Sequence, residues 1–317
     1  MNRLALLLAL PLALLLAPPL QARRAKRSPL SELKREMDRV AEGFGGTLGY
    51  SLHFRGRPEE RISLRGDERF PSASTIKIAV MCEALRQVDQ GKLSWTAEIP
   101  IQPPTEYREE GGPAYWLKED AKLPLPQWLH LMITMSDNTA TINLRNRLGQ
   151  GNINQWLTAN GFRDTLILNG KETDALGLRP LQRQYGLGMT TPNEMVRLLE
   201  RIRDGRAGSP ATCDRMLRLL SHQYWDDLVL SQAPPTAHTA AKSGALDAMR
   251  ADVALVQSPA GEYVLAVYTK DQKDQRWETD NEGNVAIRKL AALVWRRYDP
   301  ERTWSPPEGA EKLYPGG

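Results

Sequence analysis

The sequence has few residues of the kinds that build metal sites, and it has few long apolar runs. Its 317 residues include two cysteines and four histidines, which do not occur at the spacing of a tetrahedral metal site. Beyond residue 20, no apolar segment reaches the roughly 20 residues that a spanning helix needs. The G-x-S-x-G motif of a nucleophile elbow is also missing. We therefore expect no metal, no cofactor and no spanning helix in the body of the protein.

The body of the protein also lacks a net charge. The chain has 42 Lys and Arg residues against 38 Asp and Glu residues. Arg3 and the run Arg23, Arg24, Lys26 and Arg27 supply the excess, since without them 37 basic side chains face 38 acidic ones. A nucleic-acid-binding domain needs a basic face maintained across the domain. We therefore expect no nucleic-acid partner.

An apolar segment at the start of the chain indicates export. Residues 4–20 carry no charge, follow Arg3 and precede Gln21-Ala22, a small-residue end suited to cleavage. This is typical of a signal peptide over residues 1–22 and predicts a periplasmic or secreted protein. A retained membrane anchor is the alternative, because the basic run after residue 22 suits a cytoplasmic flank. The segment's 17 residues and three prolines count against an anchor.

The two cysteines, Cys82 and Cys213, leave the question of a disulfide open. Cys82 lies in the apolar run of residues 78–82, where a buried free thiol is the more common state.

The pattern along the body predicts strands near both ends of the chain and helices between them. Thr191, Pro192 and Glu194 give one helix a start with a cap, a first-turn proline and a capping box. We expect helices over residues 31–42, 127–135, 139–148, 192–203 and 284–297, a buried helix after Ser74, and strands over residues 47–54, 61–64, 239–242, 250–257 and 263–269.

These elements predict an α/β protein of the α+β type. One five-stranded antiparallel sheet, flanked by the N- and C-terminal helices, would carry an inserted all-helical domain. The sheet domain would take residues 28–70 and 212–304, the helical domain residues 71–211, and a loosely held tail residues 305–317.

Ser74-Thr-Ile-Lys77 places a hydroxyl and an amine one helical turn apart at the start of the buried helix. The positive potential of a helix N-terminus favours a serine oxygen as it becomes anionic, and a partly desolvated lysine can accept its proton. The motif is weak alone, because Ser31-Glu-Leu-Lys34 has the same spacing on a helix that is expected to be exposed. One of the two is a chance match.

Two further short motifs follow. Ser136-Asp137-Asn138 lies between two predicted helices, where it would also serve as a loop and cap. Lys242-Ser243-Gly244 ends a predicted strand, and its glycine permits close approach of a backbone or a ligand.

In order and separation, the three motifs match the S-x-x-K, S-D-N and K-T-G set of β-lactamases and penicillin-binding proteins. The chain resembles the class A serine β-lactamases from about residue 45 to residue 297. The flanks of the motifs, residues 70–77 and 133–140, and the segment Thr190-Thr-Pro192 carry this resemblance further. It implies the same fold and a small-molecule substrate, a β-lactam or a peptide resembling D-Ala-D-Ala. We expect a monomer.

The resemblance also implies a role for each motif residue. Ser74 would attack the lactam carbonyl with Lys77 as candidate base, Ser136 would relay a proton to the leaving nitrogen, and Asn138 would hold the substrate amide. The oxyanion would lie between the backbone N–H groups of Ser74 and of Ala245, the residue after Gly244. The carboxylate of the substrate would bind to Lys242, Ser243 and Arg250. A solvated charge at a strand end is the alternative for Arg250.

The sequence departs from the family at the step that frees the acyl-enzyme. The E-x-x-L-N motif is missing, and the nearest glutamate by spacing is Glu172, followed by Thr-Asp-Ala-Leu176 without an asparagine. Glu172 is our candidate deacylating base, and a solvated loop charge is the alternative.

Three functions remain open. If Glu172 is the base, the protein is a β-lactamase acting through an acyl-enzyme on Ser74. Without a base, it would be a D-alanyl-D-alanine peptidase-like penicillin-binding protein, or another serine hydrolase with slow deacylation. The third is a non-catalytic sensor of lactams or wall peptides.

A Ser-His-Asp mechanism has no support in the sequence, because no recognisable triad context surrounds any of the four histidines, His53, His130, His222 and His238. The candidates for an aromatic residue at the pocket rim are Tyr107, Tyr115 and Trp116.

Overall fold

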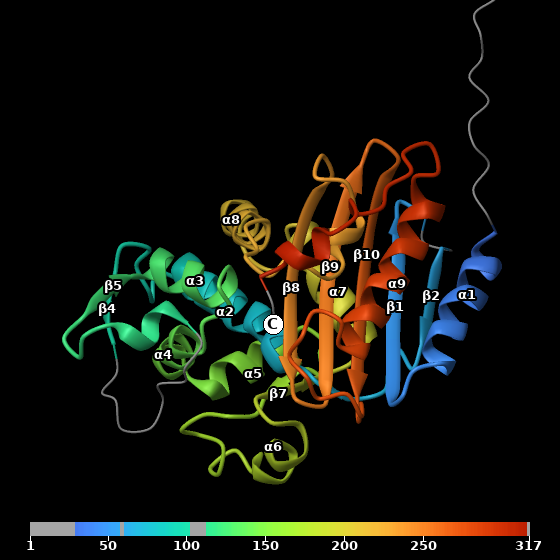
Figure 1. The fold of residues 1–317 in the computed structure, drawn as a ribbon. Coiled ribbons are helices and arrows are strands. Elements are labelled where there is room, and N and C mark those ends of the chain that lie inside the picture. Colours follow the sequence, from blue (N-terminus) through green and yellow to red (C-terminus); the bar gives the residue numbers. More distant parts are fainter. Residues whose placement is uncertain (1–28, 58–59, 102–111, 316–317) are drawn as a thin grey trace, which may run out of the picture.

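A computed structural model describes residues 29–57, 60–101 and 112–315 of the chain. The predicted signal peptide and Tyr107 lie outside these ranges. The fold is built on a five-stranded antiparallel sheet with the order β2-β1-β10-β9-β8, as predicted (Figure 1). The strands are β1 (Thr47–Arg55), β2 (Arg61–Leu64), β8 (His238–Leu246), β9 (Met249–Ser258) and β10 (Gly261–Lys270).

Two terminal helices cover one face of this sheet, α1 (Leu30–Glu42) and α9 (Glu282–Tyr298) (Figure 1). Alternate residues of β1, including Leu48, Leu52 and Phe54, pack with them into one hydrophobic core. The predicted flanking of the sheet by the N- and C-terminal helices is therefore confirmed.

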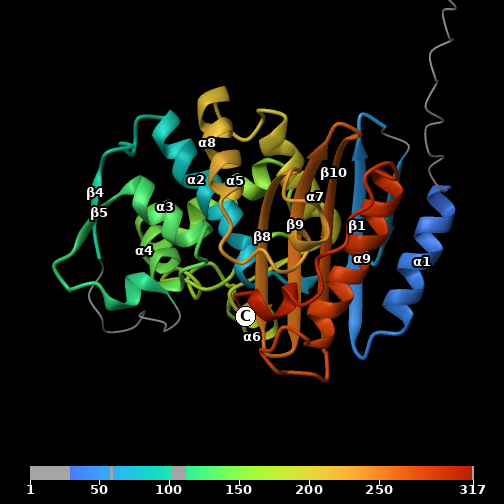
Figure 2. The ribbon, with the colours of Figure 1, turned by 45° about the horizontal axis from the view of Figure 1, so that its top comes forward.

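The opposite face of the sheet packs against a layer of helices, which Figure 2 shows beside β8. Ala251, Val253 and Leu255 of β9 join the core on this face, whereas Ala254 and Val256 join the core under α9. Burial of both faces explains the continuous apolar run of residues 253–256 in β9. The helices of this layer are α2 (Lys77–Asp89), α3 (Leu125–Ile133), α4 (Asn138–Leu148), α5 (Gln150–Ala159), α6 (Arg179–Tyr185), α7 (Pro192–Arg203) and α8 (Pro210–Leu220).

Helix α2 lies at the centre of the helical layer. Every residue from Lys77 to Leu85 is buried, which confirms the buried helix expected after Ser74. A 3₁₀ turn, η1 (Ala73–Ile76), precedes it and packs against β8. This contact joins the helical layer to the edge of the sheet.

Several short elements were not predicted. The strands β3 (Phe70–Pro71), β4 (Glu98–Pro100), β5 (Lys122–Pro124), β6 (Leu166–Ile167) and β7 (Gly188–Thr190) have two or three residues each. The 3₁₀ turns η2 (Pro113–Trp116), η3 (Leu230–Gln232) and η4 (Ala310–Leu313) have three or four. Elements of this length carry no periodic pattern. Helix α6 has no buried residue, so it too lacks an apolar stripe.

The start of α7 agrees with the prediction in part. The side chain of Thr191 caps the helix by accepting from the N–H of Glu194 at 3.1 Å. The capping box is wrong in its second half, because the Glu194 carboxylate accepts from the N–H groups of Arg163 and Asp164 and from the hydroxyl of Thr165.

Helix α7 contacts β1 and β10 directly. The boundaries between the sheet domain and the helical domain stay a prediction. In the described ranges, no helix combines the length and apolar character needed to cross a membrane.

Candidate active site

Ser74 lies in η1, just before the first turn of α2. The preceding residue, Ala73, has a φ of 43°, a left-handed conformation that costs a non-glycine residue free energy and that packing must maintain. Its side chain is buried. Such locally strained backbone is found at functional sites more often than elsewhere.

Lys77 is completely buried, with 0% of its surface exposed. Its Nζ donates to the backbone carbonyl of Ser136 at 2.6 Å and to Oδ1 of Asn138 at 2.7 Å, and it lies 3.2 Å from Oγ of Ser136. The predicted motifs Ser74-x-x-Lys77 and Ser136-Asp137-Asn138 therefore come together. By contrast, Lys34 of the chance match bonds to Asp38 on α1.

The Ser136 loop is held by two further features. Ser136 itself has a φ of 58°, and the Asp137 carboxylate accepts from the N–H groups of Ala140 and Ala114, each at 2.7 Å. Asp137 thereby caps α4 and fixes the loop to η2. Within the motif, the aspartate has a structural role and the serine and asparagine face the site.

Strand β8 brings the third motif against the nucleophile. A Cβ on Gly244 would lie 2.9 Å from the backbone nitrogen of Ser74 and 3.1 Å from the carbonyl oxygen of Ser72, so a larger residue would push the two segments apart. Ser243, Gly244 and Ala245 line a cavity together with Ser74.

Lys242 lies beneath this surface rather than on it. It is fully buried, and its Nζ donates to the carbonyl of Ser243 at 2.9 Å. Burial lowers the pKa of Lys242 to about 7, although the nearby Asp252 carboxyl raises it. Burial also raises the pKa of Asp252 to about 7. Lys242 and Asp252 therefore influence each other electrostatically from neighbouring positions of the β8–β9 pairing, in which Lys242 lies opposite Val253 and Ser243 lies opposite Asp252.

Arg250 is buried and lines the cavity, so its description as a solvated strand-end charge is wrong. Its guanidinium group donates to three backbone carbonyls, those of Leu246 at 2.5 Å, Met249 at 2.9 Å and Arg276 at 2.6 Å. These bonds hold the charge in place beside the turn between β8 and β9.

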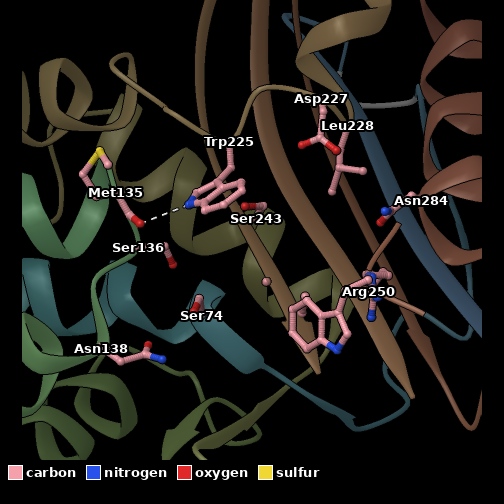
Figure 3. Close-up of a pocket in the computed structure, with 13 residues that line it drawn as sticks. Ser74, Met135, Ser136, Asn138, Trp225, Asp227, Leu228, Ser243, Arg250 and Asn284 are labelled. Atoms are coloured by element: carbon pink, nitrogen blue, oxygen red, sulfur yellow. Dashed lines mark hydrogen bonds between the residues drawn. The ribbon is translucent and has the colours of Figure 1, made fainter. Parts of the chain in front are cut away.

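Two cavities meet at Ser74, and both also contain Asn138 and Ala245. The first, which we call the Arg250 cavity, has a volume of about 330 Å³. Figure 3 shows Ser74, Ser136, Ser243 and Arg250 around it. Its remaining lining residues are Met135, Trp225, Asp227, Leu228, Gly244, Trp277 and Asn284.

The second, which we call the Gln182 cavity, has a volume of about 260 Å³ and lies against the loop and helix that precede β7. Its polar lining comes from Thr141, Arg145, Asn169 and Gln182 in addition to Ser74 and Asn138. Among the described residues that line it, none carries a carboxyl group.

The structure does not bring Glu172 to Ser74. The Glu172 carboxylate accepts from the backbone N–H groups of Gln150 at 3.2 Å and of Gly151 at 2.8 Å, at the N-terminus of α5. Neither cavity that contains Ser74 is lined by Glu172. A carboxylate in this position satisfies unpaired N–H groups and the positive end of the helix dipole.

The cavities contain residues that the sequence did not single out, above all Trp225, Trp277 and Gln182. They lie on irregular segments or on a short exposed helix, so no periodic or motif signal points to them. Of the aromatic candidates, Tyr115 and Trp116 pack edge to face, line neither cavity, and leave Trp116 81% exposed.

A histidine mechanism and a metal site receive no support in the described part of the chain. None of the four histidines lines a cavity that Ser74 lines. His53, for example, bonds to Glu200 on α7. Within the described ranges, no group of three His, Cys, Asp or Glu residues is placed to hold a metal ion.

The comparisons with known proteins agree on one family. The model of the β-lactamase enzyme family matches residues 32–298. The β-lactamase VEB-1 of Pseudomonas aeruginosa is 23% identical over 288 residues, which are 83% of this chain and 89% of that protein. The structure of the β-lactamase from Sphaerobacter thermophilus is 25% identical, with a TM-score of 0.73, and the match covers 86% of this chain and 98% of that one.

A variant of PBP-A, in an acyl-enzyme complex with penicillin G, is equally similar. It is 25% identical with a TM-score of 0.73, over 87% of this chain and 99% of that one. The family match spans the whole sheet and the helical layer, including all three motifs. This chain therefore belongs to the β-lactamase enzyme family and resembles its class A members in fold.

Proposed function

We propose that this protein is a serine hydrolase that opens β-lactam rings by forming an acyl-enzyme on Ser74 and releases the product slowly. The observation that carries the proposal is the Gln182 cavity, which adjoins Ser74 and whose described lining has no carboxyl group. Among the described residues, the arrangement has the parts for acylation, and the lining of the Gln182 cavity offers no carboxylate as a base for deacylation.

The contacts of Lys77 support the acylation step. The Ser74 oxygen attacks the lactam carbonyl carbon, and its proton passes through the buried Lys77 amine toward the Ser136 hydroxyl, 3.2 Å away. The carbon–nitrogen bond of the ring then breaks, and the nitrogen takes a proton from Ser136. Backbone N–H groups of Ser74 and Ala245 stabilise the negative oxygen.

Deacylation requires a water molecule that loses a proton as it attacks the ester carbonyl. The ester bond to the Ser74 oxygen breaks, and that oxygen regains its hydrogen. A positioned general base accelerates such a step by about 10²- to 10⁴-fold. The carboxylate of Glu172, our candidate from the sequence, accepts a hydrogen bond from the N–H of Gly151 at the start of α5 instead. The amides of Asn169 and Gln182, which line the Gln182 cavity, are too weakly basic to replace it.

The known proteins that this chain resembles include both β-lactamases and a protein captured as an acyl-enzyme, so the resemblance is compatible with fast or slow deacylation. VEB-1 and the Sphaerobacter protein are β-lactamases, which favours hydrolysis. The PBP-A variant forms an acyl-enzyme with penicillin G, which favours capture of the antibiotic. A D-Ala-D-Ala peptide presents an equivalent carbonyl and carboxylate, so it is the second substrate class that this site would accept.

We further propose that the protein acts outside the cytoplasm. The apolar segment of residues 4–20, with Arg3 before it, supports this location. N-terminal sequencing of the protein exported by its host would give residue 23 as the first residue. Recovery of intact residues 1–22 would contradict cleavage.

Intact-mass spectrometry with benzylpenicillin tests the function. Ring opening loses no atoms, so the protein should gain the full mass of the antibiotic. Ser74→Ala should gain nothing, whereas Ser31→Ala, which alters the chance match on α1, should behave as the wild type. A wild-type protein that neither gains mass nor hydrolyses the antibiotic would rule out the proposal. Hydrolysis without a detectable adduct would instead identify a β-lactamase with rapid turnover.

A further inference from the structure

The two cavities at Ser74 divide a bound substrate into two halves. The lactam carbonyl must lie at Ser74 and Ala245, which both cavities share. The carboxylate of a β-lactam lies on the nitrogen side of that carbonyl, and Ser136, the proposed proton donor to the nitrogen, lines the Arg250 cavity and not the Gln182 cavity. The leaving half, which carries the nitrogen and the carboxylate, therefore occupies the Arg250 cavity, and the acyl half occupies the Gln182 cavity.

Two indoles line the Arg250 cavity, those of Trp225 and Trp277. Trp225 donates from Nε1 to the carbonyl of Met135 at 3.0 Å, which fixes it beside Ser136 (Figure 3). Trp277 donates from Nε1 to Oδ1 of Asp247 at 3.0 Å, and the Arg250 guanidinium lies 4.9 Å from the centre of its ring. Because each indole is anchored by its nitrogen, both rings offer their surface at little cost in conformational entropy.

The apolar surface in this cavity exceeds what a small leaving group would use. Met135 and Leu228 line it together with the two indoles. A D-alanine leaving group has a single methyl group and would leave most of that surface in contact with water. Offset or edge-to-face contact with an aromatic ring is the arrangement that indoles favour.

We propose that Trp225 and Trp277 select substrates whose leaving half carries a flat, uncharged aromatic group next to its carboxylate. This inference rests on the proposed function and names the substrate class of the same site. Among β-lactams, it favours cephalosporins with a heteroaromatic substituent at position 3 over those with a methyl group there. An uncharged substituent is specified because both Arg250 and the Asp227 carboxyl line the cavity.

The test uses two cephalosporins with the same 7-acylamino group, one with a methyl group and one with a neutral heteroaryl-thiomethyl group at position 3. The second-order rate of acylation of the full-length protein is followed by intact mass, so the result does not depend on deacylation. The ratio of the two rates, compared between variants, cancels the different intrinsic reactivities of the two lactams.

Trp277→Leu should lower the ratio of heteroaryl to methyl rates by about 3- to 10-fold, the size of a good aromatic contact. Trp277 is 48% exposed, so its loss should leave the fold intact, and a thermal melt checks this. Trp225→Leu should lower the ratio in the same direction. The matched control is Trp95→Leu, because Trp95 also lies under an arginine, with Arg215 at 5.5 Å, but lines neither cavity.

An unchanged ratio in folded Trp277→Leu, or an equal fall in Trp95→Leu, would overturn the inference while leaving the proposed function in place. Failure of both cephalosporins to acylate the wild-type protein would overturn the proposed function, and the inference with it.

Discussion

The Lys77 amine lies 2.6 Å from the backbone carbonyl of Ser136 and 3.2 Å from its hydroxyl, although 59 residues separate the two in sequence. One buried amine therefore holds a loop whose serine has a positive φ of 58°. The same amine follows Ser74 by one helical turn. This contact joins the nucleophile to the group that would protonate the leaving nitrogen.

Lys77→Met should slow acylation by benzylpenicillin by about 10²- to 10⁴-fold, since it removes the proton acceptor near Ser74 and the anchor of the Ser136 loop. Lys34→Met is the matched control, because Lys34 has the same spacing from a serine but bonds to Asp38 on α1. Stopped-flow or mass measurements of acylation would check this. Equal acylation rates in both variants would remove Lys77 from the mechanism.

Glu172→Ala should destabilise the protein without altering the lifetime of the acyl-enzyme. The carboxylate accepts two N–H groups at the start of α5, and loss of a helix cap typically costs about 0.5–2 kcal/mol of unfolding free energy. Thermal melts and adduct decay are measured on the same samples. A much longer adduct lifetime in Glu172→Ala, or in the milder Glu172→Gln, would restore Glu172 as the deacylating base.

Acylation by anionic lactams should fall as the pH rises through about 7. Burial lowers the pKa of Lys242 to about 7, so above this pH the free enzyme loses a positive charge below Ser243. The pH dependence of kcat/KM, or of the second-order rate constant of acylation, reports the pKa values of groups in the free enzyme. The methyl ester of the same penicillin, which has no carboxylate, should show a smaller fall.

Asp252→Asn should move this fall to lower pH, because the Asp252 carboxylate raises the pKa of Lys242 and the amide does not. A profile that shifts to higher pH in Asp252→Asn, or a wild-type rate that increases across pH 7, would contradict this assignment.

Cys82 and Cys213 should both remain thiols in the purified protein, because both are buried and free. Burial raises the pKa of the Cys82 thiol, which lowers its reactivity. The unfolded, unreduced protein should therefore take up two alkyl groups, and a reductant should leave Tm unchanged. Uptake of no alkyl group, together with a lower Tm in reductant, would indicate a disulfide.

The groups that would perform acylation could be predicted from the sequence because they occur in short motifs on or beside regular elements. Ser74 and Lys77 are one helical turn apart, and Ser243 and Gly244 lie in a strand that continues to Leu246, so local spacing already fixes part of their geometry. The sheet was predictable for a similar reason, since β9 and β10 are long strands with apolar central runs.

The surroundings of those groups could not be predicted in the same way. Trp225 and Trp277 lie on separate irregular segments and meet at one cavity through tertiary packing. Glu172 has nearly the spacing expected of a base, but the loop places its carboxylate at the start of α5. Spacing along a loop does not determine the direction of a side chain, whereas spacing along a helix does.

The time course of the acyl-enzyme tests the central claim most directly. One equivalent of benzylpenicillin is mixed with the wild-type protein, and the free and acylated forms are followed by intact mass. We predict that the adduct on Ser74 forms fully and then decays at least about 10²-fold more slowly than it formed, because none of the described residues that line the Gln182 cavity carries a carboxyl group to activate water. Regeneration of free enzyme and hydrolysed product as fast as acylation occurs would contradict this account and establish an efficient β-lactamase.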